Sequence, residues 1–190
     1  MVVYIHGFNS SARSYKARLV RERMAALARS HEFACPELPH RPRDAIALLG
    51  DLAKEHRGLP LTLIGSSLGG YYATWLAEHH GLRTVLLNPA VRPYALLEGA
   101  IGRQTNLYTE EQYDFTDQHL RELRELEVDA VTAERYLLMV QTADEVLDYR
   151  DAVEKFAGCE QLVIDGGDHG FSDFERYLDR VLGFCGVAAA

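Results

Sequence analysis

The sequence predicts an α/β fold in which a mainly parallel sheet of about six strands is flanked by helices. Short apolar segments alternate along the chain with longer amphipathic ones, which is the order of strands joined by helical crossovers. The first segment is apolar at successive positions, as in a parallel strand buried on both faces. With 190 residues, 47% of them hydrophobic, the chain can fill one core and is too short for two ordinary domains. We therefore expect a single domain over 1–190.

Six apolar segments are expected to form the strands of this sheet. They lie at 1–5, 33–35, 61–64, 84–87, 136–140 and 161–164. Most are bounded by glycine or proline, for instance by Pro36 after the second segment and Pro60 before the third.

Helices are expected between these strands. Their ranges are 14–30, 43–56, 72–80, 117–127 and 147–156, with a last helix after His169. The first helix has an apolar side formed by Leu19, Val20, Met24, Leu27 and Ala28. On its opposite side lie Lys16, Arg18, Arg21 and Arg23, which we interpret as a solvated face. In the last helix, Ser172 and Glu175 have the spacing of a capping box.

The stretch from 91 to 133 departs from this alternation. It is polar, contains four aromatic residues (Tyr94, Tyr108, Tyr113 and Phe115) and shows one clear helical pattern, at 117–127. It is too long for an ordinary connection between a strand and a helix. We interpret it as an insertion that covers the strand ends like a cap; a purely structural side layer is the alternative.

A glycine-rich motif follows the third expected strand. Gly65-Ser66-Ser67-Leu68-Gly69 matches G-x-S-x-G and lies between a strand and a helical segment. This is the order of a nucleophile elbow, a strained turn that needs glycine two residues before and after its serine. The elbow would place Ser67 Oγ at a helix N-terminus, where developing negative charge is favoured. A loop that merely turns the chain is the alternative, which the flanking strand and helix disfavour.

A serine alcohol needs a base, and His169 is the candidate. It follows the sixth expected strand in the glycine-rich loop Gly166-Gly167-Asp168-His169-Gly170, so its ring can reach the elbow at the same sheet edge. The remaining histidines lie in loops, in the insertion, or on or near the ends of helices: His6, His31, His40, His56, His79, His80 and His119. We interpret His6 as a structural residue of its loop.

The base needs an acid to orient it, and Asp144 fits best. It lies three residues beyond the fifth expected strand. Glu145 is adjacent and should point elsewhere, and Asp148 is expected to cap the following helix. Asp165 and Asp168 also lie at a strand end but are close to His169 in sequence, which makes them less suitable partners.

An oxyanion hole is expected from two backbone amides. One is the N–H of Leu68, the residue after the nucleophile, and the other comes from the loop after the first strand, where we choose Phe8. One such donor typically contributes about 3 to 4 kcal/mol to transition-state stabilisation.

Composition excludes several classes of protein. A net charge of −8 disfavours nucleic acid as a partner, and no apolar run has the length of a membrane span. Three scattered cysteines, Cys35, Cys159 and Cys185, and the absence of a signal peptide pattern favour a reducing, cytoplasmic location. No phosphate-binding or dinucleotide-binding motif and no metal-ligand spacing is present, so no cofactor and no metal are expected.

Longer motifs add a family resemblance that covers nearly the whole chain. These motifs span residues 4–11, 65–76, 88–93, 144–150 and 166–169. In these the chain resembles the small bacterial YqiA/YcfP-like esterases of the α/β-hydrolase superfamily, and the likeness is weakest between 98 and 133. The resemblance implies a three-layer α/β-hydrolase fold that lacks the superfamily's first strands. It carries the nucleophile to Ser67, the acid to Asp144 and the base to His169. Where the family has asparagine before the histidine, this chain has Asp168, which should raise the basicity of the histidine if its carboxylate is close.

The sequence thus predicts a serine hydrolase of carboxylic esters or acyl thioesters with a small-molecule substrate. The alternatives are another acyl transfer on the same residues, such as peptide cleavage or perhydrolysis, and a binding protein that has lost turnover. Haloalkane dehalogenation is disfavoured, because that chemistry uses a carboxylate at the position of Ser67. No substrate-binding residue is assigned; Arg92, after the fourth strand, either meets an anionic head group or serves as a cap or ion-pair partner.

Overall fold

The computed structural model describes residues 1–187 and contains a parallel sheet with the strand order β2-β1-β3-β4-β7-β8. The strands are β1 (Val2–Ile5), β2 (Phe33–Ala34), β3 (Thr62–Ser66), β4 (Arg83–Leu87), β7 (Tyr136–Gln141) and β8 (Glu160–Ile164). The predicted sheet is confirmed, with boundaries shifted by one or two residues. The chain leaves β1 for one neighbour, β2, and then crosses to the other, β3, so the order reverses beside β1. Ligands bind open α/β sheets at the carboxyl ends of strands at such a point.

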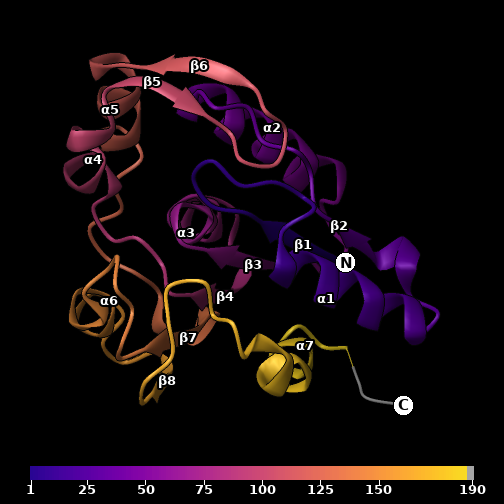
Figure 1. Cartoon of the computed structure of the whole chain (residues 1–190). Coiled ribbons are helices and arrows are strands. Elements are labelled where there is room, and N and C mark those ends of the chain that lie inside the picture. The colour runs from indigo at the N-terminus through magenta and orange to yellow at the C-terminus, as the bar shows by residue number, and fades with distance from the viewer. Residues whose placement is uncertain (188–190) are drawn as a thin grey trace.

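Helices cover both faces of this sheet (Figure 1). One face carries α1 (Tyr15–Ala26) and α7 (Leu178–Phe184); the other carries α2 (Pro42–Glu55), α3 (Leu68–His80) and α6 (Tyr149–Lys155). Strand β1 shows why: Val3 and Ile5 pack with the second group, and Val2 and Tyr4 with the first. Within residues 1–187, no helix has the length and apolarity to cross a bilayer.

Helices α1 and α7 differ from their predictions at one end. Helix α1 stops at Ala26 and not at residue 30, because Ala28 takes a left-handed conformation with φ 56°. The amide of Arg29 then donates to Met24 O, which closes the helix as a Schellman motif. At the other end of the chain, a 3₁₀ turn (Phe174–Tyr177) precedes α7, and Ser172 donates its hydroxyl to Asp168. The capping box expected for Ser172 and Glu175 is therefore wrong.

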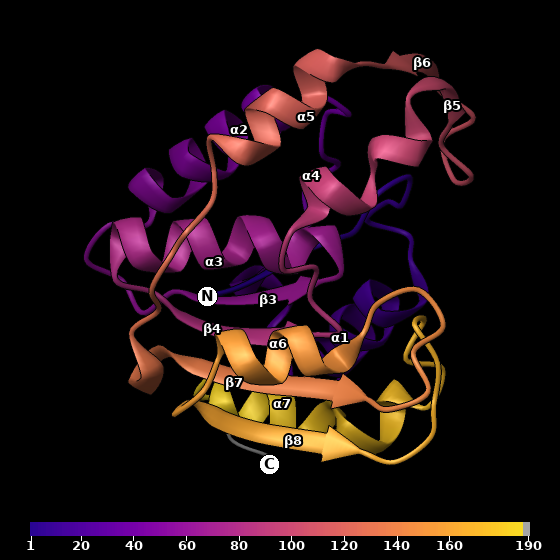
Figure 2. The ribbon, with the colours of Figure 1, turned by 90° about the vertical axis from the view of Figure 1, so that its left-hand side faces the viewer.

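The insertion contains more structure than the single predicted helix. Besides α5 (Asp117–Arg124) it has the short helix α4 (Pro93–Leu96) and an antiparallel hairpin of β5 (Gly102–Thr105) and β6 (Gln112–Phe115). A 3₁₀ turn at Glu98–Ala100 lies within the insertion, and another at Ala133–Arg135 follows at its end; a further one, at Ser30–Glu32, precedes β2. Figure 2 shows the insertion over α2 and α3, with α4 and the hairpin toward the carboxyl ends of the strands.

Glu122 attaches the insertion to α2. Its side chain is 1% exposed and accepts hydrogen bonds from Arg41 Nε and Nη2, at 2.9 and 2.7 Å. The Arg43 amide and Gln118 Nε2 also donate to it. Burial would raise the pKa of this carboxyl, but the Arg41, Gln118 and Arg43 hydrogen bonds outweigh burial and lower the pKa to about 2.

Candidate active site

Ser67 occupies a strained turn between a strand and a helix. Strand β3 ends at Ser66, and α3 begins at Leu68 rather than near residue 72 as predicted. Between them Ser67 has φ 53° and ψ −122°, a conformation that non-glycine residues rarely adopt. The turn is held because the Ser67 amide donates to Leu87 O at 3.1 Å and its carbonyl accepts from Gly70 N at 2.9 Å. This is the geometry expected for the elbow.

The flanking glycines have the steric role predicted for them. A Cβ on Gly69 would lie 2.0 Å from Ile5 O, and one on Gly65 would lie 2.6 Å from Gly69 O. Either contact is shorter than atoms allow, so both positions need glycine. The close approach of Gly69 to the end of β1 brings the elbow against the loop that follows this strand.

Ser67, His169 and Asp144 form one hydrogen-bonded chain. His169 Nε2 lies 3.0 Å from Ser67 Oγ, and Nδ1 lies 2.9 Å from Asp144 Oδ2. The His169 side chain is 21% exposed, whereas Asp144 is 2% exposed. The structure therefore brings together three residues separated by up to 102 positions in the chain.

Asp144 is held ionised by its surroundings. Its Oδ1 accepts hydrogen bonds from the amides of Val146 and Leu147, both at 2.9 Å. Burial would raise the pKa of this carboxyl, but the hydrogen bond from His169 and the two amides outweigh that effect and lower the pKa below its ordinary value. The charged carboxylate can therefore accept a hydrogen bond from the N–H at His169 Nδ1 and fix the orientation of the ring.

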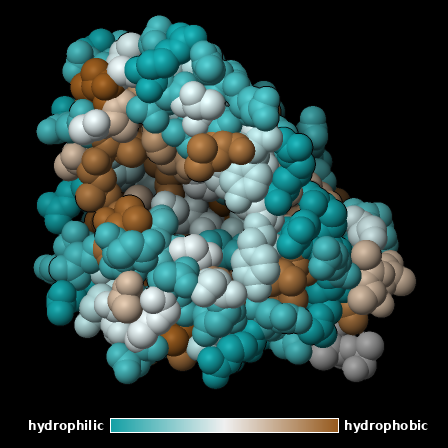
Figure 3. Space-filling model, viewed as in Figure 1, coloured by the Kyte–Doolittle hydropathy of each residue, from teal (hydrophilic) through white to brown (hydrophobic). Residues whose placement is uncertain are grey.

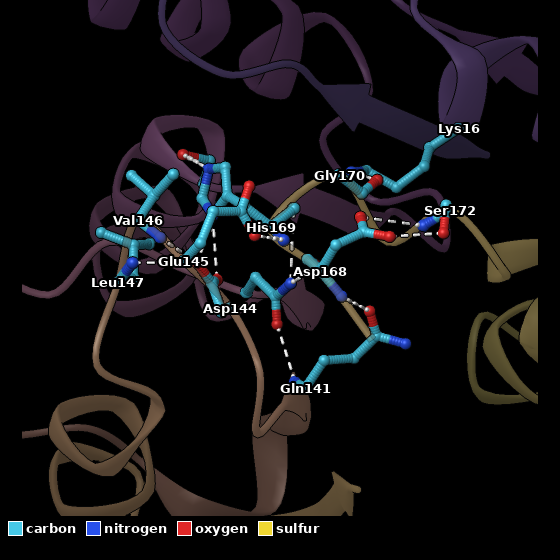
Figure 4. A network of polar contacts seen from close by, with 12 residues as sticks. Lys16, Gln141, Asp144, Glu145, Val146, Leu147, Asp168, His169, Gly170 and Ser172 are labelled. Carbon is cyan, nitrogen blue, oxygen red and sulfur yellow. Dashed lines mark hydrogen bonds and ion pairs between the residues drawn. The ribbon is translucent and has the colours of Figure 1, made fainter. Parts of the chain in front are cut away.

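The loop of His169 is fastened at several points (Figure 4). Asn88 Nδ2 donates to the carbonyls of Asp168 and His169, at 3.0 and 3.3 Å. Gln141 Oε1 accepts from the Asp168 amide at 3.0 Å, and Glu145 accepts from the His169 amide at 2.9 Å. Glu145 thus supports the loop of the base, a role its sequence position does not reveal.

Asp168 does not share the task of Asp144. Its carboxylate accepts from the amide and the hydroxyl of Ser172, whereas His169 Nδ1 contacts Asp144. The structure shows no hydrogen bond or ion pair between the Asp168 carboxylate and His169 within residues 1–187. The raised basicity expected from Asp168 therefore has no direct contact to support it.

The two residues predicted to supply the oxyanion-hole amides, Phe8 and Leu68, line the cleft at Ser67. Leu68 is the first residue of α3, so its N–H lies outside the hydrogen bonding of the helix itself. Phe8 and Leu68 line the same cleft as Ser67 and His169. A Cβ on Gly7 would lie 3.6 Å from Ser67 Oγ, so the loop after β1 runs directly past the hydroxyl.

His6 has the structural surroundings predicted for it. Its side chain is buried, Nε2 accepts from the Leu38 amide at 3.2 Å, and Nδ1 lies 3.1 Å from Gly7 O. Burial lowers the pKa of His6, which favours the neutral ring that can accept this hydrogen bond. The contacts tie the loop after β1 to the segment that follows β2.

Two clefts, each of about 260 Å³, meet at Ser67 and His169 and also share Phe8. One is mostly apolar and is lined by Leu68, Ala90, Pro93, Leu96, Leu97, Val146 and Leu147. Pro93 and Leu96 belong to α4 and Leu97 follows it directly, so the insertion forms one wall of the cleft. Figure 3 shows a hollow on this face with hydrophobic surface along one border.

The second cleft has both polar and apolar lining, and it contains a lysine whose burial the helical pattern does not predict. It is lined by Ser10, Ser14, Tyr15, Lys16 and Tyr108, among others. Lys16 was expected on a solvated helix face, but it is 9% exposed and donates to Gly170 O, next to His169. The return of the chain after β8 covers this end of α1, a long-range contact that helical periodicity does not indicate. Arg92, the cation considered from the sequence, is exposed and lines neither cleft.

Comparisons with solved structures show the class of fold. Alpha/beta hydrolase domain-containing protein 10 from mouse superposes with a TM-score of 0.72, at 15% identity and over 96% of this chain and 89% of the other. Est1E from Butyrivibrio proteoclasticus gives 0.73, at 14% identity over 96% and 85%. The structure of the metagenome-derived lipolytic enzymes LipS and LipT gives 0.72, at 19% identity over 98% and 93%. The chain therefore has the α/β-hydrolase fold, which confirms the predicted fold class.

Sequence comparison identifies the family. A UPF0227 protein of Serratia proteamaculans (strain 568) is 27% identical over 188 residues, covering 97% of this chain and 98% of the relative. The UPF0227 protein YcfP of Salmonella paratyphi A is 25% identical over 190 residues, with the same shares. The family model described as "Uncharacterised protein family (UPF0227)" matches residues 1–186. This chain belongs to the UPF0227 family, which includes the YcfP proteins, and has the α/β-hydrolase fold.

Proposed function

We propose that the protein is a serine hydrolase that cleaves carboxylic esters or acyl thioesters through an acyl-enzyme. The observation that carries this proposal is the hydrogen-bonded chain from Ser67 through His169 to Asp144, at the junction of two clefts. An alcohol, a base and an ionised acid in this order are what acyl transfer to serine requires.

In the first half of the reaction, Ser67 Oγ attacks the acyl carbon and His169 Nε2 takes the hydroxyl proton. The amides of Phe8 and Leu68 stabilise the oxyanion that forms on the carbonyl oxygen. The bond from the acyl carbon to the leaving oxygen or sulfur then breaks, and His169 returns the proton to the leaving group. The products of this half are a free alcohol or thiol and the acylated Ser67.

In the second half, water replaces the alcohol. His169 removes a proton from the water, which attacks the acyl carbon, and the second oxyanion forms at the same two amides. Collapse releases the carboxylic acid and returns the proton to Ser67 Oγ. The apolar cleft beside Leu68 and α4 suits the acyl group, because a carbon chain bound there is removed from water and contacts mostly apolar side chains.

Hydrolysis of p-nitrophenyl esters and of acyl thioesters of matched chain length tests this proposal. Ser67→Ala should lower kcat by about 10⁴-fold or more. Ser30→Ala is the control, because Ser30 is an exposed serine that lines neither cleft; it should retain the activity. Hydrolysis that persists in Ser67→Ala, or a folded wild-type protein that acts on none of these compounds, would contradict the proposal.

We place this activity in the cytoplasm. Cys35, Cys159 and Cys185 are free thiols in the structure, as expected of a chain that folds under reducing conditions.

A further inference from the structure

Lys16 is a buried cation beside the candidate active site. Its side chain is among the buried charged groups, and within residues 1–187 it forms no ion pair; its hydrogen bond goes to the uncharged carbonyl of Gly170. Buried charges in proteins are normally paired, because leaving water is costly for an isolated ion. Lys16 is therefore suited to a negative group that arrives with a ligand.

Ser14, in the same cleft, adds a buried hydroxyl that has no hydrogen-bond partner among the described residues. It is the N-cap residue of α1, yet its side chain makes no capping hydrogen bond, and its buried Oγ has no partner within residues 1–187. The first N–H groups of α1, which lie beyond the hydrogen bonding of the helix itself, adjoin it and carry the positive end of the helix dipole. An ammonium, a hydroxyl and a helix N-terminus therefore converge on one cleft.

The position of this cleft relative to Ser67 indicates what it would hold. It shares Phe8, Ser67 and His169 with the apolar cleft, so two parts of one substrate can diverge from the reacting carbon. We propose that the cleft of Ser14 and Lys16 binds an anionic group, a carboxylate or a phosphate, on the alcohol or thiol portion of the substrate. This inference rests on the proposed function and narrows its substrate class to esters of anionic alcohols or thiols with apolar acyl groups.

The charge of Lys16 agrees with this role. Burial lowers the pKa of its ammonium to about 8, while the carboxylates of Asp168 and Asp144 act in the opposite direction. Lys16 therefore carries its charge at neutral pH. The competing explanation is that Lys16 only fastens the His169 loop through Gly170, in which case its removal would slow neutral and anionic substrates equally.

Three butyrate esters separate these explanations: those of 4-hydroxybenzoate, 4-hydroxyphenyl phosphate and the neutral 4-hydroxybenzamide. The measurement is the ratio of kcat/KM for each anionic ester to that for the neutral one. In Lys16→Met this ratio should fall about tenfold or more, mainly through KM, because a hydrogen bond between charged groups is lost. In Ser14→Ala it should fall about two- to tenfold. The carboxylate and phosphate esters show which anion the cleft prefers.

Arg92→Met is the matched control, because it removes a cation that lines neither cleft, and it should leave the ratio unchanged. A ratio unchanged in Lys16→Met, whatever happens to the absolute rates, overturns the inference and leaves Lys16 as a loop anchor. A fall in Arg92→Met without one in Lys16→Met overturns it as well.

Calorimetric binding of the two alcohols 4-hydroxybenzoate and 4-hydroxybenzamide to the wild-type protein tests the cleft without turnover. Tighter binding of the carboxylate that is lost in Lys16→Met supports the anion site even if no ester is hydrolysed, which would then count only against the proposed hydrolase. Equal binding of both compounds in wild type and variant contradicts the anion site.

Discussion

Two carboxylates beside His169 have separate tasks, although they are neighbours in the sequence. Asp144 accepts from the ring at Nδ1, and Glu145 accepts from the backbone amide of the same residue. The first contact sets the tautomer and orientation of the base, and the second fixes the loop that carries it. The sequence identifies Asp144 by its place after a strand, but it offers no signal for Glu145, whose role depends on how the loop after β8 returns.

Replacing Asp144 by asparagine should lower kcat by about 10⁴-fold at neutral pH while leaving the fold intact. The neutral amide can donate a hydrogen bond to Nδ1, which favours the wrong tautomer of His169. Because the pKa of Asp144 lies below its ordinary value, the wild-type carboxylate stays ionised across the neutral range, so the deficit of the variant should persist throughout that range. Steady-state kinetics from pH 6 to about 9 check this, and a variant with near-native kcat would remove Asp144 from the proposed mechanism.

Glu145 should affect activity through the loop and not through the reaction. Glu145→Ala should lower kcat several-fold, because the His169 amide loses its acceptor, whereas Glu145→Gln keeps an oxygen there and should stay close to wild type. Kinetics of the two variants on one ester test this. Equal loss in both would show that the charge of Glu145 matters rather than its hydrogen bond.

Among the elements, the elbow is set by close packing between β1 and α3. The sequence predicts the role of Gly65 and Gly69, because the motif requires residues without side chains at these two positions. The start of α3 was placed four residues too late, since the run Leu68 to Tyr71 contains two glycines, which have low helix propensity. Tertiary contact overrides that propensity here.

Gly69→Ala should destabilise the fold by about 2 to 4 kcal/mol, because its Cβ would meet the carbonyl of Ile5 at 2.0 Å. Gly50→Ala is the matched control: Gly50 lies within α2 and nothing lies within 4 Å of an added Cβ. That variant should be about 0.5 to 1 kcal/mol more stable than wild type. Urea unfolding measures both, and a Gly69→Ala protein as stable as wild type would mean that α3 can move away from β1.

The hairpin of the insertion was missed for a physical reason. Strand β5 is exposed along most of its length and has no apolar alternation. Strand β6, Gln-Tyr-Asp-Phe, does alternate strictly between exposed and buried side chains, and this pattern could have revealed it. A pattern of four residues is weak evidence for a strand when the partner strand shows no pattern of its own.

Considered as a whole, the molecule is a hydrolase-fold body and an insertion joined in part by Glu122. Because the folded pKa of Glu122, about 2, lies below the ordinary 4.5, its carboxylate stabilises the fold fully above pH 4.5. This contribution, about 2 to 3 kcal/mol, is lost as the pH falls from 4.5 through 2.

Glu122→Gln should therefore be less stable than wild type by about 2 to 3 kcal/mol at pH 7, and the difference should shrink as the pH approaches 2. Urea unfolding at pH 7, 4 and about 3 measures this, with the exposed Glu110→Gln as a control within the same insertion. A difference that is constant with pH would show that the ion pair with Arg41 does not carry the coupling.

At this scale the sequence predicts the fold and the residues that converge on the elbow, because strand order and strand ends constrain both. It does not predict the cleft lined by Ser14 and Lys16. The helical periodicity places Lys16 on the exposed side of its helix. The side chain is buried because the chain returns over it at Gly170.

Labelling with a fluorophosphonate probe, followed by mass mapping of the adduct, tests the central claim most directly. The account predicts one adduct, on Ser67, that is absent in Ser67→Ala and forms far more slowly in His169→Ala. A folded wild-type protein that does not react, or that reacts at another serine, would contradict an activated nucleophile at the elbow.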